Sequence, residues 1–164
     1  MFKKLLFICT VLFISLIIVT YILTDINQQS KAIWDSSSGV NVSFFEIFTN
    51  NLYVAFKSIF FSPITFGFSG IIYLIVNGIN IGVYLKMYSS IDSAMYLFIP
   101  HAVIELPGIV YSVATSLYVV YVIVYFSKEK LRVLIKNIIV CIVLIALSAV
   151  IEVYITPLIY SWIK

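Results

Sequence analysis

Three ionisable side chains in the apolar stretches of this chain are of types that could do chemistry. His101 and Glu105 are four residues apart and would share one face of a helix, and Glu152 follows in a later stretch. A histidine oriented by a carboxylate can act as a general base, and such groups can also hold zinc. The H-E-x-x-H pattern of zinc helices and the G-x-S-x-G nucleophile turn are both missing, however. We therefore expect no metal, no cofactor and no catalytic residue, with an intramembrane peptidase that uses His101 and Glu105 as an alternative.

Other polar residues interrupt the apolar stretches at helical spacing. Glu46 and Asn50 are four apart, and Asn77 and Asn80 are three apart, so each pair would share a helix face. An ionisable group at the centre of a membrane helix costs about 2.5–3.5 kcal/mol on insertion scales, which makes it a functional candidate. We predict that these groups converge into one polar cluster for binding. Its members are Glu46, Asn50, Asn77, Asn80, His101, Glu105 and Glu152. The alternative is that they only hydrogen-bond the helices together.

The composition determines what kind of element positions these residues. Of the 164 residues, 63% are hydrophobic and 10% are charged, whereas a soluble domain is about half apolar and roughly a quarter charged. Lipid must therefore cover part of the surface, and the long unbroken apolar runs favour helices over a β-barrel. We predict an all-α fold, a polytopic membrane helical bundle that forms a single integral membrane domain over residues 1–164.

Five apolar runs predict about five transmembrane helices. The first has about 19 residues without a small-residue cleavage site, so we expect it to stay as a span rather than a signal peptide. Ser43 and Glu46 fit a capping box that starts the second helix, and Ser62-Pro63 would end it. Residues 24–42 form a polar loop. The predicted spans are residues 5–23, 44–61, 64–85, 101–126 and 137–160.

The basic residues predict the orientation, because cytoplasmic loops concentrate Lys and Arg. Five crossings with the N-terminus inside and the C-terminus outside put most of them on the cytoplasmic side. These are Lys3, Lys4, Lys128, Lys130, Arg132 and Lys136. The polar cluster and the 24–42 loop then lie on the extracytoplasmic side. The net charge of +3 is scattered without a basic stripe, so we expect no nucleic-acid partner.

Four glycines lie in the third run. Gly78 and Gly82 form a G-x-x-x-G pattern, which lets two helices approach closely, and Gly67 and Gly70 precede them. This pattern predicts that residues 64–85 are the central packing element. The glycines would serve either packing within the chain or homo-oligomerisation.

The order of these motifs resembles the stage II sporulation protein M family. The matching segments are Phe48-Thr49-Asn50-Asn51, Asn77-Gly78 with Gly82, Pro100-His101-Ala102-Val103-Ile104-Glu105-Leu106, and Ile151-Glu152 with Thr156-Pro157. They extend roughly from Phe44 to Tyr160. The chain departs from the family pattern at Ala102, where Gly is usual, and it looks shorter than typical sporulation members.

This resemblance implies a multi-pass protein of the bacterial cell membrane. Sporulation members act as engulfment scaffolds for peptidoglycan hydrolases, and short relatives occur in circular-bacteriocin gene clusters, linked to maturation, export or self-protection. We expect a non-enzymatic membrane component of a multi-protein assembly, in the bacteriocin role ahead of engulfment. Its partners would be other membrane proteins or a hydrophobic cationic peptide. The remaining alternative is a small cation or peptide transporter that uses Glu105 and Glu152.

Overall fold

Helices joined by short turns make up the part of the chain that the computed structural model describes, residues 1–25, 43–89 and 95–163. No strand occurs among these residues. The elements are α1 (Phe2–Leu23), α3 (Phe44–Phe61), α4 (Phe68–Ser89), α5 (Met95–Val124), α6 (Lys128–Val150), a π-helical segment η1 (Ile151–Ile155) and α7 (Thr156–Ile163). The predicted loop 24–42 lies mostly outside the described residues.

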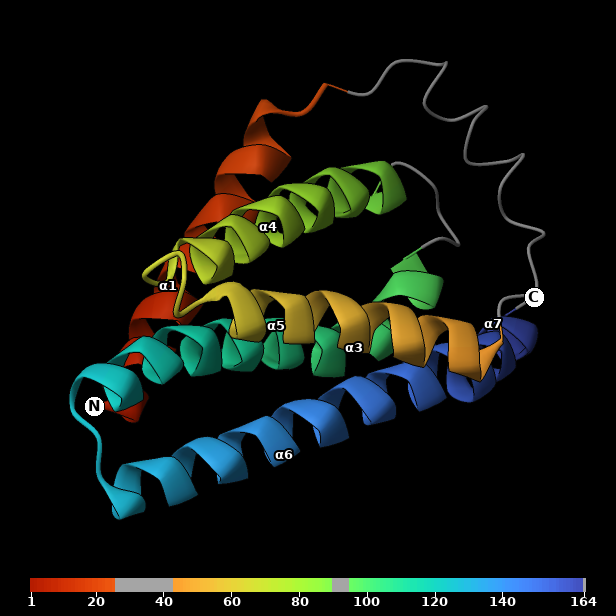
Figure 1. Ribbon diagram of the computed structural model, residues 1–164. Helices are drawn as coiled ribbons and strands as arrows, with labels where there is room; N and C mark the ends of the chain where they lie inside the picture. The colour runs from red at the N-terminus through yellow and green to blue at the C-terminus, as the bar shows by residue number, and fades with distance from the viewer. Residues whose placement is uncertain (26–42, 90–94, 164) are drawn as a thin grey trace.

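Four helical stretches are long and apolar enough to cross a bilayer, namely Phe2–Leu23, Phe68–Met87, Ala102–Val124 and Lys128–Ile159. The predicted all-α membrane bundle is therefore confirmed. Helix α3 is not among these four, because Glu46, Asn50, Asn51 and Lys57 lower its apolar content. It nevertheless runs the length of the bundle beside the other helices (Figure 1).

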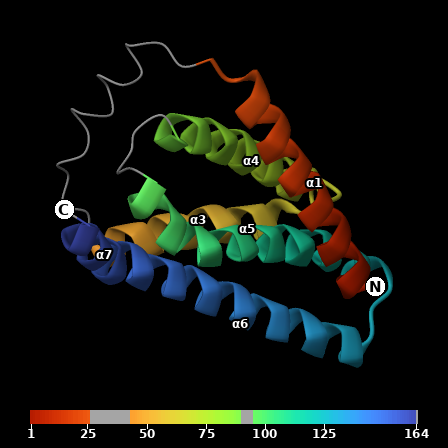
Figure 2. The same ribbon diagram turned by 180° about the vertical axis from the view of Figure 1, so that it is seen from behind.

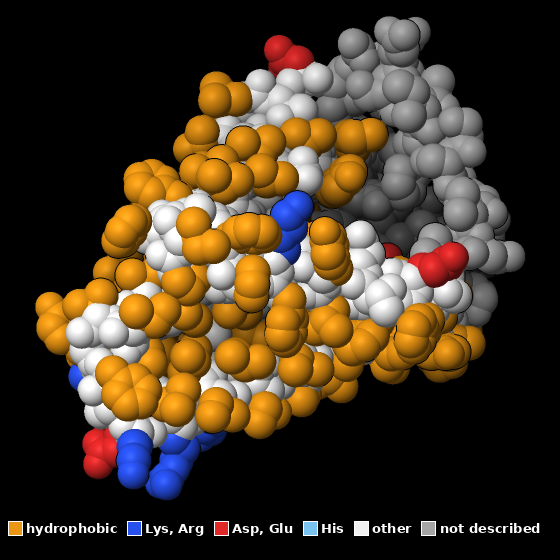
Figure 3. All heavy atoms as spheres, viewed as in Figure 1, with side chains coloured by type: hydrophobic (Ala, Val, Ile, Leu, Met, Phe, Trp, Pro, Cys, Tyr) orange, Lys and Arg blue, Asp and Glu red, His pale blue; other side chains and the backbone are white. Residues whose placement is uncertain are grey.

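The ends of the helices gather at two ends of the bundle. The N-terminus, the turn at residues 62–67 and the connection at residues 125–127 lie at one end, and α7 lies at the other (Figures 1 and 2). Basic side chains cluster at the first end, whereas apolar side chains predominate over the rest of the described face in view, with one basic and a few acidic side chains among them (Figure 3). We call the first end the basic end. That it faces the cytoplasm stays a prediction.

Helix α5 is the centre of the bundle, since it contacts α1, α3, α4, α6 and α7. Its Val113 and Ala114 are almost completely buried, in a core shared with Phe13 of α1 and Leu74 of α4. The expectation that residues 64–85 would form the central element was wrong. α4 packs on α1, α3 and α5, but much of its surface stays open to lipid.

Two helix starts differ from the expected boundaries for local reasons. α4 begins at Phe68 rather than at residue 64, because Phe66 and Gly67 both have positive φ, 50° and 92°, which interrupts the helix. α6 begins at Lys128 rather than at residue 137, because the Ser127 hydroxyl accepts a hydrogen bond from the Lys130 backbone N–H and caps the helix. The basic residues after Ser127 therefore lie on the first turns of α6.

The C-terminal span widens into a π-helical turn next to Pro157. Proline has no N–H to donate to the carbonyl four residues earlier. Here the Thr156 backbone N–H donates instead to the carbonyl oxygen of Ile151, five residues earlier, and the Thr156 hydroxyl donates to the same oxygen at 3.1 Å. Glu152 therefore lies on a widened turn, a feature that often occurs at functional sites.

Candidate functional site

A polar cavity of about 130 Å³ lies between α3, α4, α5 and α6. It is lined by Asn50, Asn51, Val54, Tyr73, Asn77, Glu105, Gly108, Ile109, Leu144, Ile145 and Ser148. Each of these helices therefore contributes at least one polar side chain. The volume has room for a few water molecules or for one small polar group of a partner, but not for a whole peptide.

Glu105 is the charged group of this cavity, and Glu152 lies close enough for the two carboxyl charges to interact. Both side chains are partly buried. The remaining polar lining consists of amides and hydroxyls. The Asn77 amide nitrogen donates to the backbone carbonyl of Tyr73 at 2.8 Å, which fixes the orientation of Asn77.

Three of the seven predicted cluster residues thus line one cavity, namely Asn50, Asn77 and Glu105. Glu152 is not among its lining residues, although its charge interacts with that of Glu105. Asn80 instead lines a neighbouring groove between α3 and α4. Glu46 is exposed at the start of α3, and its carboxylate accepts hydrogen bonds from the Ser43 backbone N–H at 2.8 Å and the Ser43 hydroxyl at 2.9 Å. The predicted capping box is confirmed. The side chain of His101, on α5, lies outside the described part of the chain.

Three polar lining residues were not singled out from the sequence as part of the cluster, namely Asn51, Tyr73 and Ser148. Tyr73 is four residues before Asn77 on α4, and Ser148 is four residues before Glu152. The i, i+4 spacing from a predicted member could have revealed both. Ser148 is buried and its hydroxyl has no hydrogen-bond partner within the described residues. A buried hydroxyl of this kind can form a hydrogen bond with a ligand or a water molecule that enters the cavity.

The donor set of the cavity suits a small cation or a hydrogen-bond donor. Two neighbouring carboxylates attract positive charge in a poorly solvated site, and amide oxygens can share its N–H groups. Among the described residues, no group of three His, Cys, Asp or Glu side chains is placed to hold a metal ion.

Comparison with known proteins places the chain in a family. Residues 5–157 match the family described as stage II sporulation protein M. The chain belongs to the stage II sporulation protein M family. It is also 31% identical over 137 residues to an uncharacterized protein of Methanocaldococcus jannaschii, an alignment that covers 76% of each chain. No solved structure matches the chain.

The glycines of this stage II sporulation protein M family member lie against other helices of the same chain. A Cβ at Gly78 would lie 3.0 Å from the Leu16 Cβ of α1, and one at Gly82 would lie 2.6 Å from the Thr20 Cβ. Around the start of α4, a Cβ at Gly67 would meet Leu117 of α5, and one at Gly70 would meet Ser116 of the same helix. These glycine faces are therefore occupied within one chain, which favours internal packing over homo-oligomerisation through this motif.

Proposed function

We propose that this protein is a non-enzymatic, multi-pass component of a membrane assembly that binds an apolar partner through one cationic group. The observation that supports this most directly is the placement of Glu105 in a cavity with Asn50 and Asn77, where the charge of Glu152 also acts on it. In the predicted orientation this cavity faces the extracytoplasmic half of the cell membrane. An ammonium group of a partner helix would place its charge beside the two carboxylates.

The partner is a hydrophobic cationic peptide or the membrane protein that carries it, in circular bacteriocin maturation, export or self-protection. Two features support this. Much of the chain's apolar surface is open to lipid, so a partner can reach it within the membrane, and the cavity admits a side-chain head group rather than a polypeptide segment. An engulfment scaffold would use the same helices with a protein partner.

A defined peptide tests the cationic contact. The probe is a poly-leucine helix of about 20 residues, long enough to span, with one lysine in its outer third, and the control peptide carries glutamine at that position. Cross-linking in vesicles is measured for the wild-type chain and for Glu105→Gln. We expect the lysine peptide to cross-link more strongly than the control peptide, and this preference to disappear in Glu105→Gln.

Three further outcomes would overturn the proposal. An equal yield with both peptides would exclude recognition of the cation. A loss of Glu105→Gln from the membrane, with unchanged cross-linking per molecule, would return Glu105 to a role in helix packing. Cleavage of the lysine peptide that disappears in His101→Ala would indicate an intramembrane peptidase instead. Asn80→Ala is the matched control, because Asn80 lies on α4 but does not line the cavity.

A further inference from the structure

A second hollow lies on the lipid-facing side of the bundle, as a groove of about 640 Å³ between α3 and α4. Its walls are largely apolar, and they include Val54, Phe61, Ile72 and Val76. Sites that bury small-molecule ligands have volumes of about 300–1,000 Å³. The groove is therefore large enough for part of a lipid molecule.

Lys57 lines this groove and is the single charged residue between positions 47 and 85. Within the described residues its ammonium faces an aromatic ring rather than a carboxylate, 5.8 Å from the ring centre of Tyr53. One basic side chain is visible among apolar ones on the face that α3 and α4 form (Figure 3). The groove thus offers a positive charge that no carboxylate among the described residues neutralises.

Next to Lys57, Ser58 provides an independent sign of a missing ligand. Ser58 is 5% exposed and lines the groove, and its hydroxyl has no hydrogen-bond partner in the described structure. Its backbone carbonyl, in contrast, accepts hydrogen bonds from the hydroxyls of Ser69 at 2.8 Å and Ser116 at 3.2 Å. A buried hydroxyl without a partner loses the hydrogen bonds that it would make in water. A ligand oxygen in the groove would restore one.

The turn that joins α3 to α4 indicates the depth of this site. It exposes large apolar side chains, with Ile64 69% and Phe66 82% exposed. Its backbone is bonded within the protein, since the Gly67 N–H donates to Ser62 at 2.9 Å and Ser69 N–H to the Thr65 hydroxyl at 3.1 Å. Non-helical backbone with such bonding is compatible with a membrane environment.

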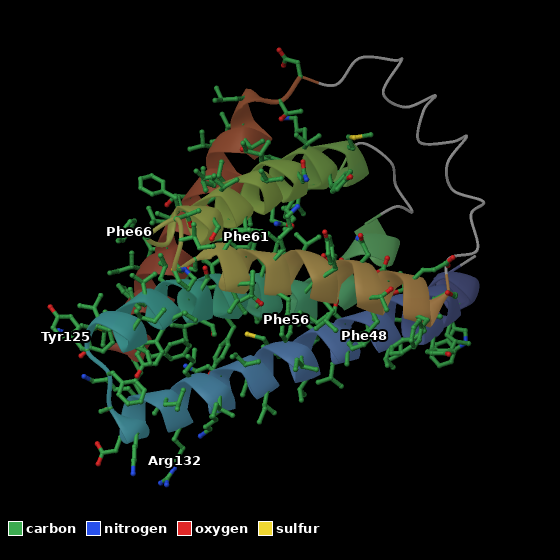
Figure 4. All side chains as sticks on the ribbon, in the orientation of Figure 1. Phe48, Phe56, Phe61, Phe66, Tyr125 and Arg132 are labelled. Carbon is green, nitrogen blue, oxygen red and sulfur yellow. The ribbon has the colours of Figure 1, made fainter. Side chains whose placement is uncertain are left out.

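The turn also lies less far out than the connection after Tyr125 at the same end (Figures 1 and 4). We place it near the boundary between headgroups and hydrocarbon, because its exposed side chains are apolar and its backbone is bonded within the protein. Lys57 is four residues before the end of α3, about 6 Å deeper at 1.5 Å per residue. A lysine side chain spans such a distance by extending toward the interface.

We propose that the groove between α3 and α4 binds an anionic phospholipid from the leaflet at the basic end. The Lys57 ammonium pairs with the lipid phosphate, Ser58 donates to a lipid oxygen, and an acyl chain lies along Ile72 and Val76. Charge complementarity selects the headgroup, and the apolar walls hold the chain. The groove shares Val54, Tyr73 and Asn77 with the cavity of Glu105, but Lys57 and Ser58 line only the groove and Glu105 lines only the cavity. A test on Lys57 therefore stands or falls independently of the proposed function.

Lipid retention tests this site. The full chain is purified from vesicles that contain equal amounts of phosphatidylglycerol and phosphatidylcholine, and the retained ratio is measured by mass spectrometry. We expect Lys57→Gln to lower the anionic preference about fivefold, the effect of one basic side chain near an anionic lipid surface. Lys57→Arg should keep the preference, which separates lost charge from a lost fold. Lys86→Gln is the matched control, because Lys86 also lies over a tyrosine ring, that of Tyr21 at 4.8 Å, but is not in the groove.

A second pair of variants tests the groove itself. Ile72→Trp should displace the bound lipid, whereas Ile71→Trp should not, since Ile71 is exposed on α4 without lining the groove. An equal retained ratio in Lys57→Gln and Lys86→Gln, or retention in Ile72→Trp, would overturn the proposal. So would complete competition by inorganic phosphate, which would indicate a site for free anions. Retention of an acidic hydrophobic peptide in place of lipid would do the same.

Discussion

Gly82 of α4 lies directly against the backbone of Ile17 in α1. A Cβ at position 82 would be 2.8 Å from the Ile17 carbonyl oxygen and 2.6 Å from the Thr20 Cβ. A backbone oxygen cannot move aside as the end of a side chain can. The close contact between α1 and α4 therefore requires glycine at this position.

Replacement of Gly82 should weaken the contact between α1 and α4. We expect Gly82→Ala to lower the free energy of unfolding by about 1–3 kcal/mol, the usual effect of overpacking. Gly108→Ala is the control, because its Cβ would meet the Leu144 Cβ at 3.6 Å, an ordinary contact. Thermal unfolding in detergent, followed by circular dichroism, measures both. Equal melting temperatures for the two variants would contradict the observed packing.

The hydroxyl of Ser62 anchors the end of α3 to the central helix. Ser62 is fully buried and donates a 2.6 Å hydrogen bond to the Ser116 carbonyl oxygen of α5. We expect Ser62→Ala to lower the free energy of unfolding by about 0.6–2 kcal/mol, the range for hydrogen bonds between membrane helices. Ser15→Ala should have little effect, since the exposed Ser15 hydroxyl bonds only within α1, to Val11. A larger loss in Ser15→Ala, by the same unfolding assay, would refute this assignment.

The capping box at the start of α3 predicts opposite results for two substitutions. Ser43→Ala should cost about 1 kcal/mol, because it removes the hydroxyl that accepts from the Glu46 N–H at 3.3 Å. Glu46→Gln should preserve the helix, since glutamine can also accept from the Ser43 N–H. Unfolding measurements on both variants decide the question. Strong destabilisation by Glu46→Gln would show that the negative charge, rather than the cap, matters.

The orientation can be measured with single cysteines. Cys9 and Cys141 are buried, so they should react slowly with a membrane-impermeant maleimide. We expect Glu129→Cys, at the basic end, to be labelled only in permeabilised cells, and Ser43→Cys, at the other end, to be labelled in intact cells. The opposite pattern would invert the topology and would place the Glu105 cavity on the cytoplasmic side.

Local physics made several elements predictable from the sequence. The excess of apolar residues over charged ones predicts membrane helices whatever their arrangement. The box of Ser43 and Glu46 predicts the start of α3, and Ser62-Pro63 predicts its end at Phe61. The start of α6 was missed because Ser127, a single capping residue without a capping box, gives a weaker signal.

The tertiary structure alone decided which polar side chains meet. Helical spacing places Asn77 and Asn80 on the same face of α4. In the structure, however, Asn77 lines both the Glu105 cavity and the groove between α3 and α4, whereas Asn80 lines only the groove. The packing of the helices also made α5 the central helix. The physical reason is that spacing along the sequence determines which residues lie on the same face of a helix. Which neighbouring helix that face contacts depends on how the helices pack against one another. In a membrane, that packing depends on close contacts between helices, such as the contact of Gly82 with Ile17. Such a contact joins two distant segments, so neither segment predicts it alone.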